Sequence, residues 1–213
     1  MKIIATASTV LLIAGITCAT AQELKSIKLP PPQTEIGKPL MQVLKLRQSS
    51  RNFDSIALPM QEVSNILWAA YGINRPESGK RTAPSAMNWQ EVDLYVAMAE
   101  GLFLYDPKGN HLNLVIAKDL RPATGSQAFV ANAPLNIVYV ADFARASKAS
   151  DEDKILYTAA DVGFIAENVY LYCASEGLAV VVRGSVDRTS LAEALKLRAD
   201  QKIILTQTVG YGK

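Results

Sequence analysis

The sequence predicts an α+β fold in which short strands are separated by helices and one long helix lies near the middle of the chain. A stripe of apolar residues at helical spacing runs from Ile155 to Cys173, and short apolar segments bounded by turn residues lie on either side of it. The chain is 49% hydrophobic and 20% charged, which is typical of a globular protein. Its 213 residues suit one domain, which we assign to residues 40–213.

Composition excludes several classes of function. The chain has 22 Lys plus Arg against 20 Asp plus Glu, so it lacks the strong positive charge of a general nucleic-acid binder. One histidine and two cysteines cannot supply the four ligands of a structural zinc site, and a histidine-dependent catalytic triad could use only His111. We expect no metal and no nucleic acid.

The first 21 residues have the pattern of a secretory signal. Lys2 precedes an apolar run from Val10 to Ile16, and Ala19-Thr20-Ala21 is a small-residue cleavage site. That run is shorter than the roughly 20 residues of a membrane span. We expect cleavage after Ala21, an exported protein (periplasmic or secreted), and no stable membrane insertion afterwards. Cys173 is then the lone cysteine, and its apolar helical face predicts a place in the core.

Residues 22–39, rich in proline and lysine, predict an extended leader. Helical spacing follows at Leu40, Val43 and Leu44, and again after Pro59. The second of these helices is indicated by Val63, Ile66, Leu67 and Ala70.

Strand patterns occupy the next part of the chain. Residues 92–105 and 112–116 flank the turn sequence Asp106-Pro107-Lys108-Gly109-Asn110, which predicts a hairpin. Residues 135–140 form a nearly continuous apolar run, which is typical of a strand buried on both faces.

The long helix has a start signal and a stop signal. Ser150 with Asp153 resembles a capping box, and Glu176-Gly177 ends the pattern. A helix of about 26 residues would be roughly 39 Å long. One stripe, expected to face the core, consists of Ile155, Ala159, Val162, Ala166, Val169 and Cys173. A second stripe, Leu156, Ala160 and Gly163, has small residues that allow another helix or subunit to approach closely. A strand (178–182), a helix (189–197) and a strand (203–209) complete the prediction.

Three short segments are candidates for ligand binding. In the first, Arg47 and Arg51 flank Ser49, and two forked guanidinium groups with a hydroxyl can converge on one phosphate. The second runs from Arg81 to Gln90 and contains the loop Pro84-Ser85-Ala86-Met87-Asn88-Trp89-Gln90, whose small polar residues can approach a flat heteroaromatic ring. The third is the strand end at Arg183-Gly184, where main-chain N–H groups become available. No P-loop and no G-x-G-x-x-G motif accompanies them, so a nicotinamide cofactor would be a transient substrate.

Together and in this order, the three segments resemble the FMN-dependent nitroreductase family, and most closely its branch related to the azoline-oxidising dehydrogenases of peptide natural products. The resemblance implies a mostly antiparallel central sheet flanked by helices, and a homodimer with FMN at the subunit interface. It also implies a set of cofactor-binding residues: Arg47, Gln48, Ser49, Arg51, Pro84, Ser85, Asn88, Gln90, Arg183, Gly184 and Lys213. Arg183 and Gly184 would act near flavin N5 through the main chain, and no side chain is expected to be catalytic.

The activity that the resemblance implies is electron transfer. A nicotinamide or other small-molecule donor would reduce the flavin, and an electron-poor acceptor such as a nitroaromatic or quinone would reoxidise it. Two alternatives remain open: an azoline-type dehydrogenase acting on a peptide, and an exported flavin-binding protein without turnover. The chain departs from the family at Ala179, where a second glycine is usual, and at Arg183, where many members have an acidic residue.

Overall fold

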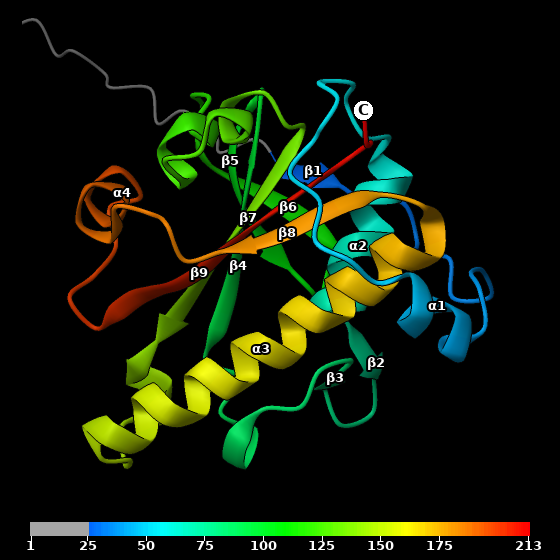
Figure 1. The fold of residues 1–213 in the computed structure, drawn as a ribbon. Coiled ribbons are helices and arrows are strands. Elements are labelled where there is room, and N and C mark those ends of the chain that lie inside the picture. The colour runs from blue at the N-terminus through cyan, green and yellow to red at the C-terminus, as the bar shows by residue number, and fades with distance from the viewer. Residues whose placement is uncertain (1–25) are drawn as a thin grey trace, which may run out of the picture.

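A seven-stranded sheet forms the centre of the computed structural model, which describes residues 26–213 (Figure 1). Its strand order is β1-β6-β5-β4-β7-β9-β8, and every pair of neighbouring strands in it is antiparallel. The strands are β1 (Ser26–Lys28), β4 (Val92–Met98), β5 (Gly101–Asp106), β6 (His111–Ile116), β7 (Leu135–Asp142), β8 (Ala179–Arg183) and β9 (Gln201–Gly210). The predicted α+β class with an antiparallel central sheet is confirmed. The export segment predicted for residues 1–21 lies outside the described residues.

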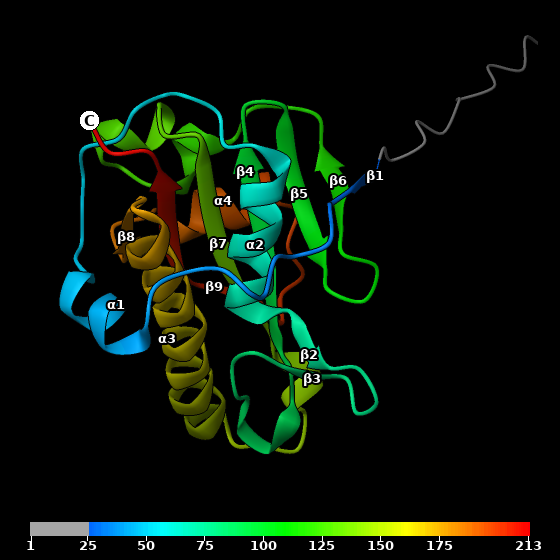
Figure 2. The same ribbon diagram turned by 90° about the vertical axis from the view of Figure 1, so that its right-hand side faces the viewer.

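Helices cover both faces of this sheet, as Figures 1 and 2 show together. The helices are α1 (Leu40–Leu46), α2 (Met60–Tyr71), α3 (Asp151–Glu176) and α4 (Arg188–Ala194), with short 3-10 turns η1 (Ala86–Asn88), η2 (Arg121–Thr124), η3 (Ala128–Ala131) and η4 (Phe143–Ala146). A separate two-stranded hairpin is formed by β2 (Ile73–Arg75) and β3 (Lys80–Arg81). No helix among residues 26–213 is both long and apolar enough to cross a membrane.

The long helix α3 begins and ends where its sequence signals predict. The Ser150 hydroxyl accepts the Asp153 N–H at 3.1 Å, and Gly177 takes the left-handed conformation at φ 77° that ends the 26-residue helix. Val162, Ala166, Val169 and Cys173 are buried as predicted. Ile155, predicted to be in the core, is instead 64% exposed, and Ala159 of the same stripe is also exposed, because the covered face of the first turns of α3 is that of Tyr157, Thr158 and Asp161.

The core lies on both sides of β7, all eight residues of which are buried. One cluster packs α2 and α3 on one face of the sheet, and another packs Leu191 and Leu195 from the α4 region on the other face. The sequence prediction of a strand buried on both faces is therefore confirmed.

Two parts of the sheet differ from the sequence prediction. The expected hairpin is a three-stranded meander, because β4 and β5 are joined by a tight turn at Ala99-Glu100. Gly101 permits that turn: its φ is 156°, and a Cβ there would lie 2.7 Å from the Ile116 carbonyl oxygen. The segment predicted to be an extended leader also contributes to the fold, because β1 pairs with β6 and Leu29 is buried in the core.

Candidate functional site

The first candidate segment lies along the free edge of β8. Helix α1 ends at Leu46, and the chain then runs beside the strand, where the Ser50 N–H donates to the Val180 carbonyl at 2.9 Å. The Tyr170 hydroxyl of α3 lies 2.9 Å from Ser49 Oγ and accepts the Val182 N–H at 2.8 Å. The segment 47–51 is thus fixed to both β8 and α3, which joins the first predicted site to the third.

Positive charge gathers at this edge. The Arg47 guanidinium lies 5.4 Å from the centre of the Tyr170 ring, and Arg51 is exposed. The C-terminus returns to the same place, because Asn52 Nδ2 donates to the Lys213 carbonyl at 3.2 Å. Within residues 26–213, the ion pairs found do not include Arg47, Arg51 or Lys213. Three uncommitted cations and the Ser49 hydroxyl are groups that an anion such as a phosphate requires.

At the third segment, the pairing of β8 with β9 indicates which main-chain N–H group, that of Arg183 or that of Gly184, is available to a ligand. Val180 and Val182 direct their polar groups away from β9, as their bonds to Ser50 and Tyr170 show. Polar groups alternate along an edge strand, so the N–H of Arg183 faces its partner Thr206 in β9. Gly184, which is exposed, is the next residue whose N–H points outward. Of the two predicted main-chain donors, Gly184 is the one this edge leaves free.

The Arg183 side chain has a structural role that sequence analysis missed. It is 3% exposed, and it donates to the Thr124 carbonyl at 2.8 Å and to Asn136 Oδ1 at 3.0 Å. A Cβ at Gly125 would lie only 1.9 Å from Arg183 Nη1, so the η2 segment packs directly on the guanidinium. Burial lowers the pKa of Arg183 to about 10. The Arg183 side chain therefore supports the fold, and this role is separate from the main-chain contact predicted near flavin N5.

The loop of the second candidate segment, residues 84–90, has several residues with positive φ angles. Met87, Asn88 and Gln90 have φ values of 48°, 56° and 48°. Left-handed conformations are uncommon for residues other than glycine, and they persist only where surrounding contacts impose them. Met87 and Asn88 are both exposed. The loop is therefore held in a costly shape that presents side chains outward, as a binding loop does.

Two buried carboxylates hold one side of this loop. Asp161 of α3 accepts the Ala86 N–H at 2.8 Å, and Glu91 accepts the Ser85 hydroxyl at 3.2 Å. The Ser85 oxygen in turn accepts the Gln90 N–H at 2.8 Å. Asp161 and Glu91 are 3% and 0% exposed, and Glu91 Oε1 has no hydrogen-bond partner.

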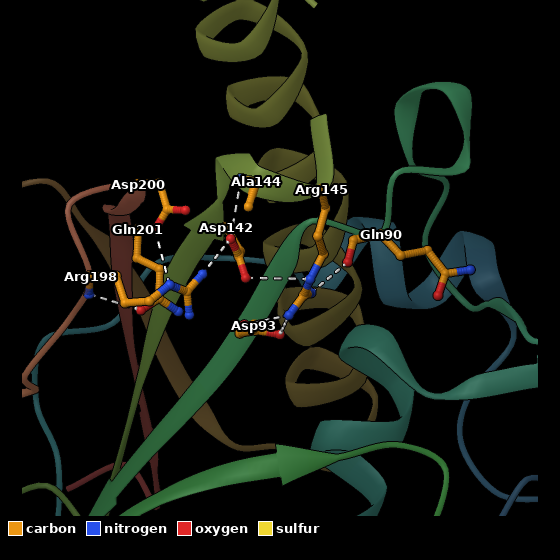
Figure 3. A network of polar contacts seen from close by, with 8 residues as sticks. All are labelled: Gln90, Asp93, Asp142, Ala144, Arg145, Arg198, Asp200 and Gln201. Atoms are coloured by element: carbon orange, nitrogen blue, oxygen red, sulfur yellow. Dashed lines mark hydrogen bonds and ion pairs between the residues drawn. The ribbon is translucent and has the colours of Figure 1, made fainter. Parts of the chain in front are cut away.

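A network of ion pairs holds the other side of the loop (Figure 3). Arg145 donates to the Gln90 carbonyl at 2.8 Å and pairs with Asp93 at 2.8 Å. Asp142 lies 3.6 Å from Arg145 and also pairs with Arg198 at 2.8 Å. Through these contacts the ends of β4 and β7 fix the main chain where the loop enters the sheet.

Beside the loop is a cavity of about 450 Å³, which we call the hairpin cavity. Its lining combines the loop with the β2–β3 hairpin: Arg75, Lys80, Arg81, Thr82, Ala83, Pro84, Ser85, Asn88 and Gln90. Arg81 is fixed there, because its Nε donates to Gln90 Oε1 at 2.8 Å and its guanidinium lies 4.3 Å from the centre of the Tyr71 ring. The four side chains predicted in the second segment thus share one cavity.

Within one chain the predicted residues form two separate groups. The loop is attached to α3 at Asp161, and the segment 47–51 is attached at Tyr170. Nine helical positions correspond to about 14 Å along the axis. Sequence reasoning missed Tyr170, Asp161, Glu91 and two cations of the β2–β3 hairpin, Arg75 and Lys80. The best available signal was Asp161, a carboxylate beside the buried stripe of α3.

The position of Asp161 predicts a pH dependence of stability. Burial raises the pKa of Asp161 above its ordinary value of 3.8, and the charge of Glu91 raises it further, although the Ala86 N–H opposes this. The folded protein therefore binds this proton more tightly than the unfolded chain, so the stabilisation is present below pH 3.8 and is lost as pH rises through the raised pKa. Asp161→Asn keeps an acceptor for the Ala86 N–H and has no carboxyl to ionise at this position, so its stability should not decrease with pH in this way.

Urea unfolding of both proteins between pH 4 and 7 measures the effect. The stability of Asp161→Asn relative to the natural protein should increase with pH. A difference that is constant, or that decreases with pH, contradicts the assignment.

The fold and the two sites define a class: α+β proteins in which one long helix spans an antiparallel sheet and polar binding segments are attached at two points along it. The chain belongs to the nitroreductase family, whose model matches residues 44–211. A Methanocaldococcus jannaschii protein, provisionally named a nitroreductase, is 31% identical over 169 residues, which cover 75% of this chain and 85% of that protein.

Two solved structures extend the comparison. A provisionally named nitroreductase from Ralstonia eutropha is 45% identical, with a TM-score of 0.85 over 92% of this chain and 93% of that chain. A chain of the Escherichia coli microcin synthetase McbBCD complex, solved with truncated pro-MccB17 bound, has a TM-score of 0.70 at 15% identity, over 96% of this chain and 85% of that chain. At that identity the second likeness concerns the fold alone.

Proposed function

We propose that the protein is an FMN-dependent oxidoreductase that passes electrons from a nicotinamide or other small-molecule donor to an electron-poor acceptor such as a nitroaromatic or quinone. Membership of the nitroreductase family supports the reaction class. The observation that carries the proposal is that Arg47, Arg51 and Lys213, which take part in none of the ion pairs among residues 26–213, belong to segments fixed beside the Ser49 hydroxyl at the free edge of β8.

These residues fit the polar part of FMN. Arg47, Arg51 and Lys213 would bind the phosphate, and the Ser49 hydroxyl, oriented by Tyr170, would add a hydrogen bond. Gln48 is exposed beside them, with its main chain near the same edge. When bound, FMN supplies the ability to accept and release a hydride at ring atom N5. The Gly184 N–H is the donor proposed for that atom, with Arg183 holding the strand end in place.

The second group of residues would come from another copy of the chain. Pro84, Ser85, Asn88 and Gln90 line a cavity of their own, well along α3 from Ser49. A homodimer in which these side chains contact the flavin ring held by the other copy would unite the two groups. The surface of α3 supports it: Ile155, Leu156 and Phe164 are 64%, 61% and 49% exposed. Large exposed apolar patches are uncommon on monomers.

We expect Ala160→Glu to convert a dimer into a monomer and to reduce bound FMN. Ala160 is exposed on α3, and a Cβ added at neighbouring Gly163 would meet no atom within 4 Å, so this face has room for another helix. Light scattering and flavin absorbance measure both effects. Ala199→Glu, an exposed change outside α3, is the control. A natural protein that is monomeric with FMN fully bound contradicts the dimer proposal.

The function is tested by anaerobic stopped-flow reduction of the purified protein. Flavin absorbance should decay on mixing with NADH, NADPH or a reduced quinol, and it should recover on adding a nitroaromatic or quinone. A protein that binds no flavin refutes the proposal. Bound flavin that no donor reduces would favour a flavin-binding protein without turnover. Reduction of the flavin only by an azoline peptide would favour the peptide dehydrogenase, because that enzyme oxidises the azoline and its flavin accepts the electrons.

Export of the protein is part of the same proposal, because it decides which donors are available. The amino-terminal pattern that motivates it ends at Ala21. Sequencing of the mature protein should find Gln22 first, and retention of Met1 would refute export.

A further inference from the structure

The hairpin cavity has two chemically different walls. One is the loop 84–90, whose Pro84, Asn88 and Gln90 are uncharged. The other is the β2–β3 hairpin, which contributes Arg75, Lys80 and Arg81. A volume of about 450 Å³ is within the range of small-molecule sites. A ligand in this cavity therefore contacts a neutral polar surface on one side and three cations on the other.

The hairpin cations have no acidic partners. None of the ion pairs found among residues 26–213 includes Arg75, Lys80 or Arg81. Of the nearby acids, Asp161 and Glu91 hold the loop and Asp93 pairs with Arg145, while Glu77, in the turn of the hairpin, is exposed and is in none of these ion pairs. The charge of this wall is thus not balanced by an ion pair within the described protein.

The three cations differ in how firmly they are held. Arg81 is fixed by Gln90 and the Tyr71 ring, and desolvation lowers its pKa. Arg75 donates to the Arg81 carbonyl at 2.5 Å, while Lys80 is exposed and makes no side-chain hydrogen bond in the structure. Thr82 Oγ1, on the same wall, is buried without a partner. The wall therefore combines two hydrogen-bonded guanidinium groups, one exposed lysine and one hydroxyl without a partner, which together suit an oxyanion.

We propose that the hairpin cavity binds the anionic group of the electron acceptor, so that the enzyme prefers planar acceptors bearing a carboxylate or sulfonate over uncharged ones of the same shape. This inference rests on the proposed function, since the neutral wall is the one assigned to the flavin ring. The β2–β3 hairpin then selects acceptors by their charge, and the loop 84–90 keeps its proposed contact with the flavin ring.

A matched pair of substrates tests the inference: 4-nitrobenzoate and 4-nitrobenzamide have nearly the same shape and differ in charge. The FMN-loaded natural protein should have a lower KM for 4-nitrobenzoate at low salt, and the difference should shrink with added salt. Lys80→Gln should reduce the preference about 3- to 10-fold, as expected for removing one partly screened charge about 5 Å from the ligand. Lys202→Gln, an exposed lysine of β9 outside the cavity, should leave the preference intact.

Calorimetric binding of benzoate and benzamide to the oxidised protein gives a readout independent of turnover, and Lys80→Gln should weaken benzoate selectively. Equal affinities for the two compounds in the natural protein, or an unchanged ratio in Lys80→Gln, would overturn the inference. A change confined to the flavin reduction potential would also overturn it, because the cations would then act on the flavin. Failure of the flavin to be reduced or reoxidised at all would instead refute the proposed function, while benzoate binding still decides the charge preference.

Discussion

Arg51→Ala should weaken FMN binding about 10- to 150-fold, which corresponds to losing charge-assisted hydrogen bonds of roughly 1.5–3 kcal/mol. Arg51 is exposed and makes no side-chain bond in the structure, so its removal should leave the fold intact. Arg47→Ala should cost at least as much, because Arg47 is half-buried and also contacts the Tyr170 ring that orients Ser49.

Riboflavin is the informative control, because it has the ring and ribityl chain of FMN but no phosphate. Its affinity should change little in Arg51→Ala. In Arg47→Ala it should fall moderately, through the disturbed Tyr170. Lys202→Ala should affect neither flavin. Fluorescence titration with both ligands measures all four proteins, and equal losses for FMN and riboflavin in Arg51→Ala would show that this arginine does not bind the phosphate.

The parts of the fold that sequence could predict are those specified by local chemistry. Ser150 and Gly177 mark the ends of α3 through hydrogen bonds and a left-handed turn that depend on nearby residues alone. The turn at Ala99-Glu100 was missed because a two-residue connection leaves almost no composition signal. Strand β1 was missed because its pairing with β6 is a long-range contact, and three residues are too few to show a period.

The candidate site divides in a similar way. Motif residues such as Arg47 and Ser49 were found because their types and spacing indicate phosphate chemistry. Tyr170 and Asp161 were not, because each acts by contacting a segment far away in sequence, which no local pattern reveals. The structural role of the Arg183 side chain could not be predicted for the same reason: its partners, Thr124 and Asn136, lie 59 and 47 positions away.

The largest loss of stability is expected from Asn136→Ala. Asn136 is completely buried, donates to the Val130 carbonyl at 2.9 Å, and accepts from Arg183 Nη2 at 3.0 Å and from the Thr208 hydroxyl at 2.5 Å. The truncation removes the partner of the Val130 carbonyl, of the Thr208 hydroxyl and of Arg183 Nη2, and the charged guanidinium keeps its bond to the Thr124 carbonyl. The free energy of unfolding should fall by about 3–5 kcal/mol, since a buried charge that loses a partner is costly. Urea unfolding measures the loss, with exposed Asn132→Ala as a control expected to stay within about 0.5 kcal/mol.

Asn136→Asp separates the charge of Arg183 from its hydrogen bonds. The carboxylate still accepts from Arg183 and Thr208 and supplies a counter-charge to a guanidinium that has none, but it cannot donate to Val130. It should therefore cost less than Asn136→Ala. If the two variants are equally unstable, the Val130 bond dominates and Arg183 does not depend on this acceptor. If Asn136→Asp is much the more stable, the buried charge governs this part of the fold. In that case flavin affinity should also fall more in Asn136→Ala than in Asn136→Asp, because Asn136 holds Arg183 and Gly184 is the next residue in the chain.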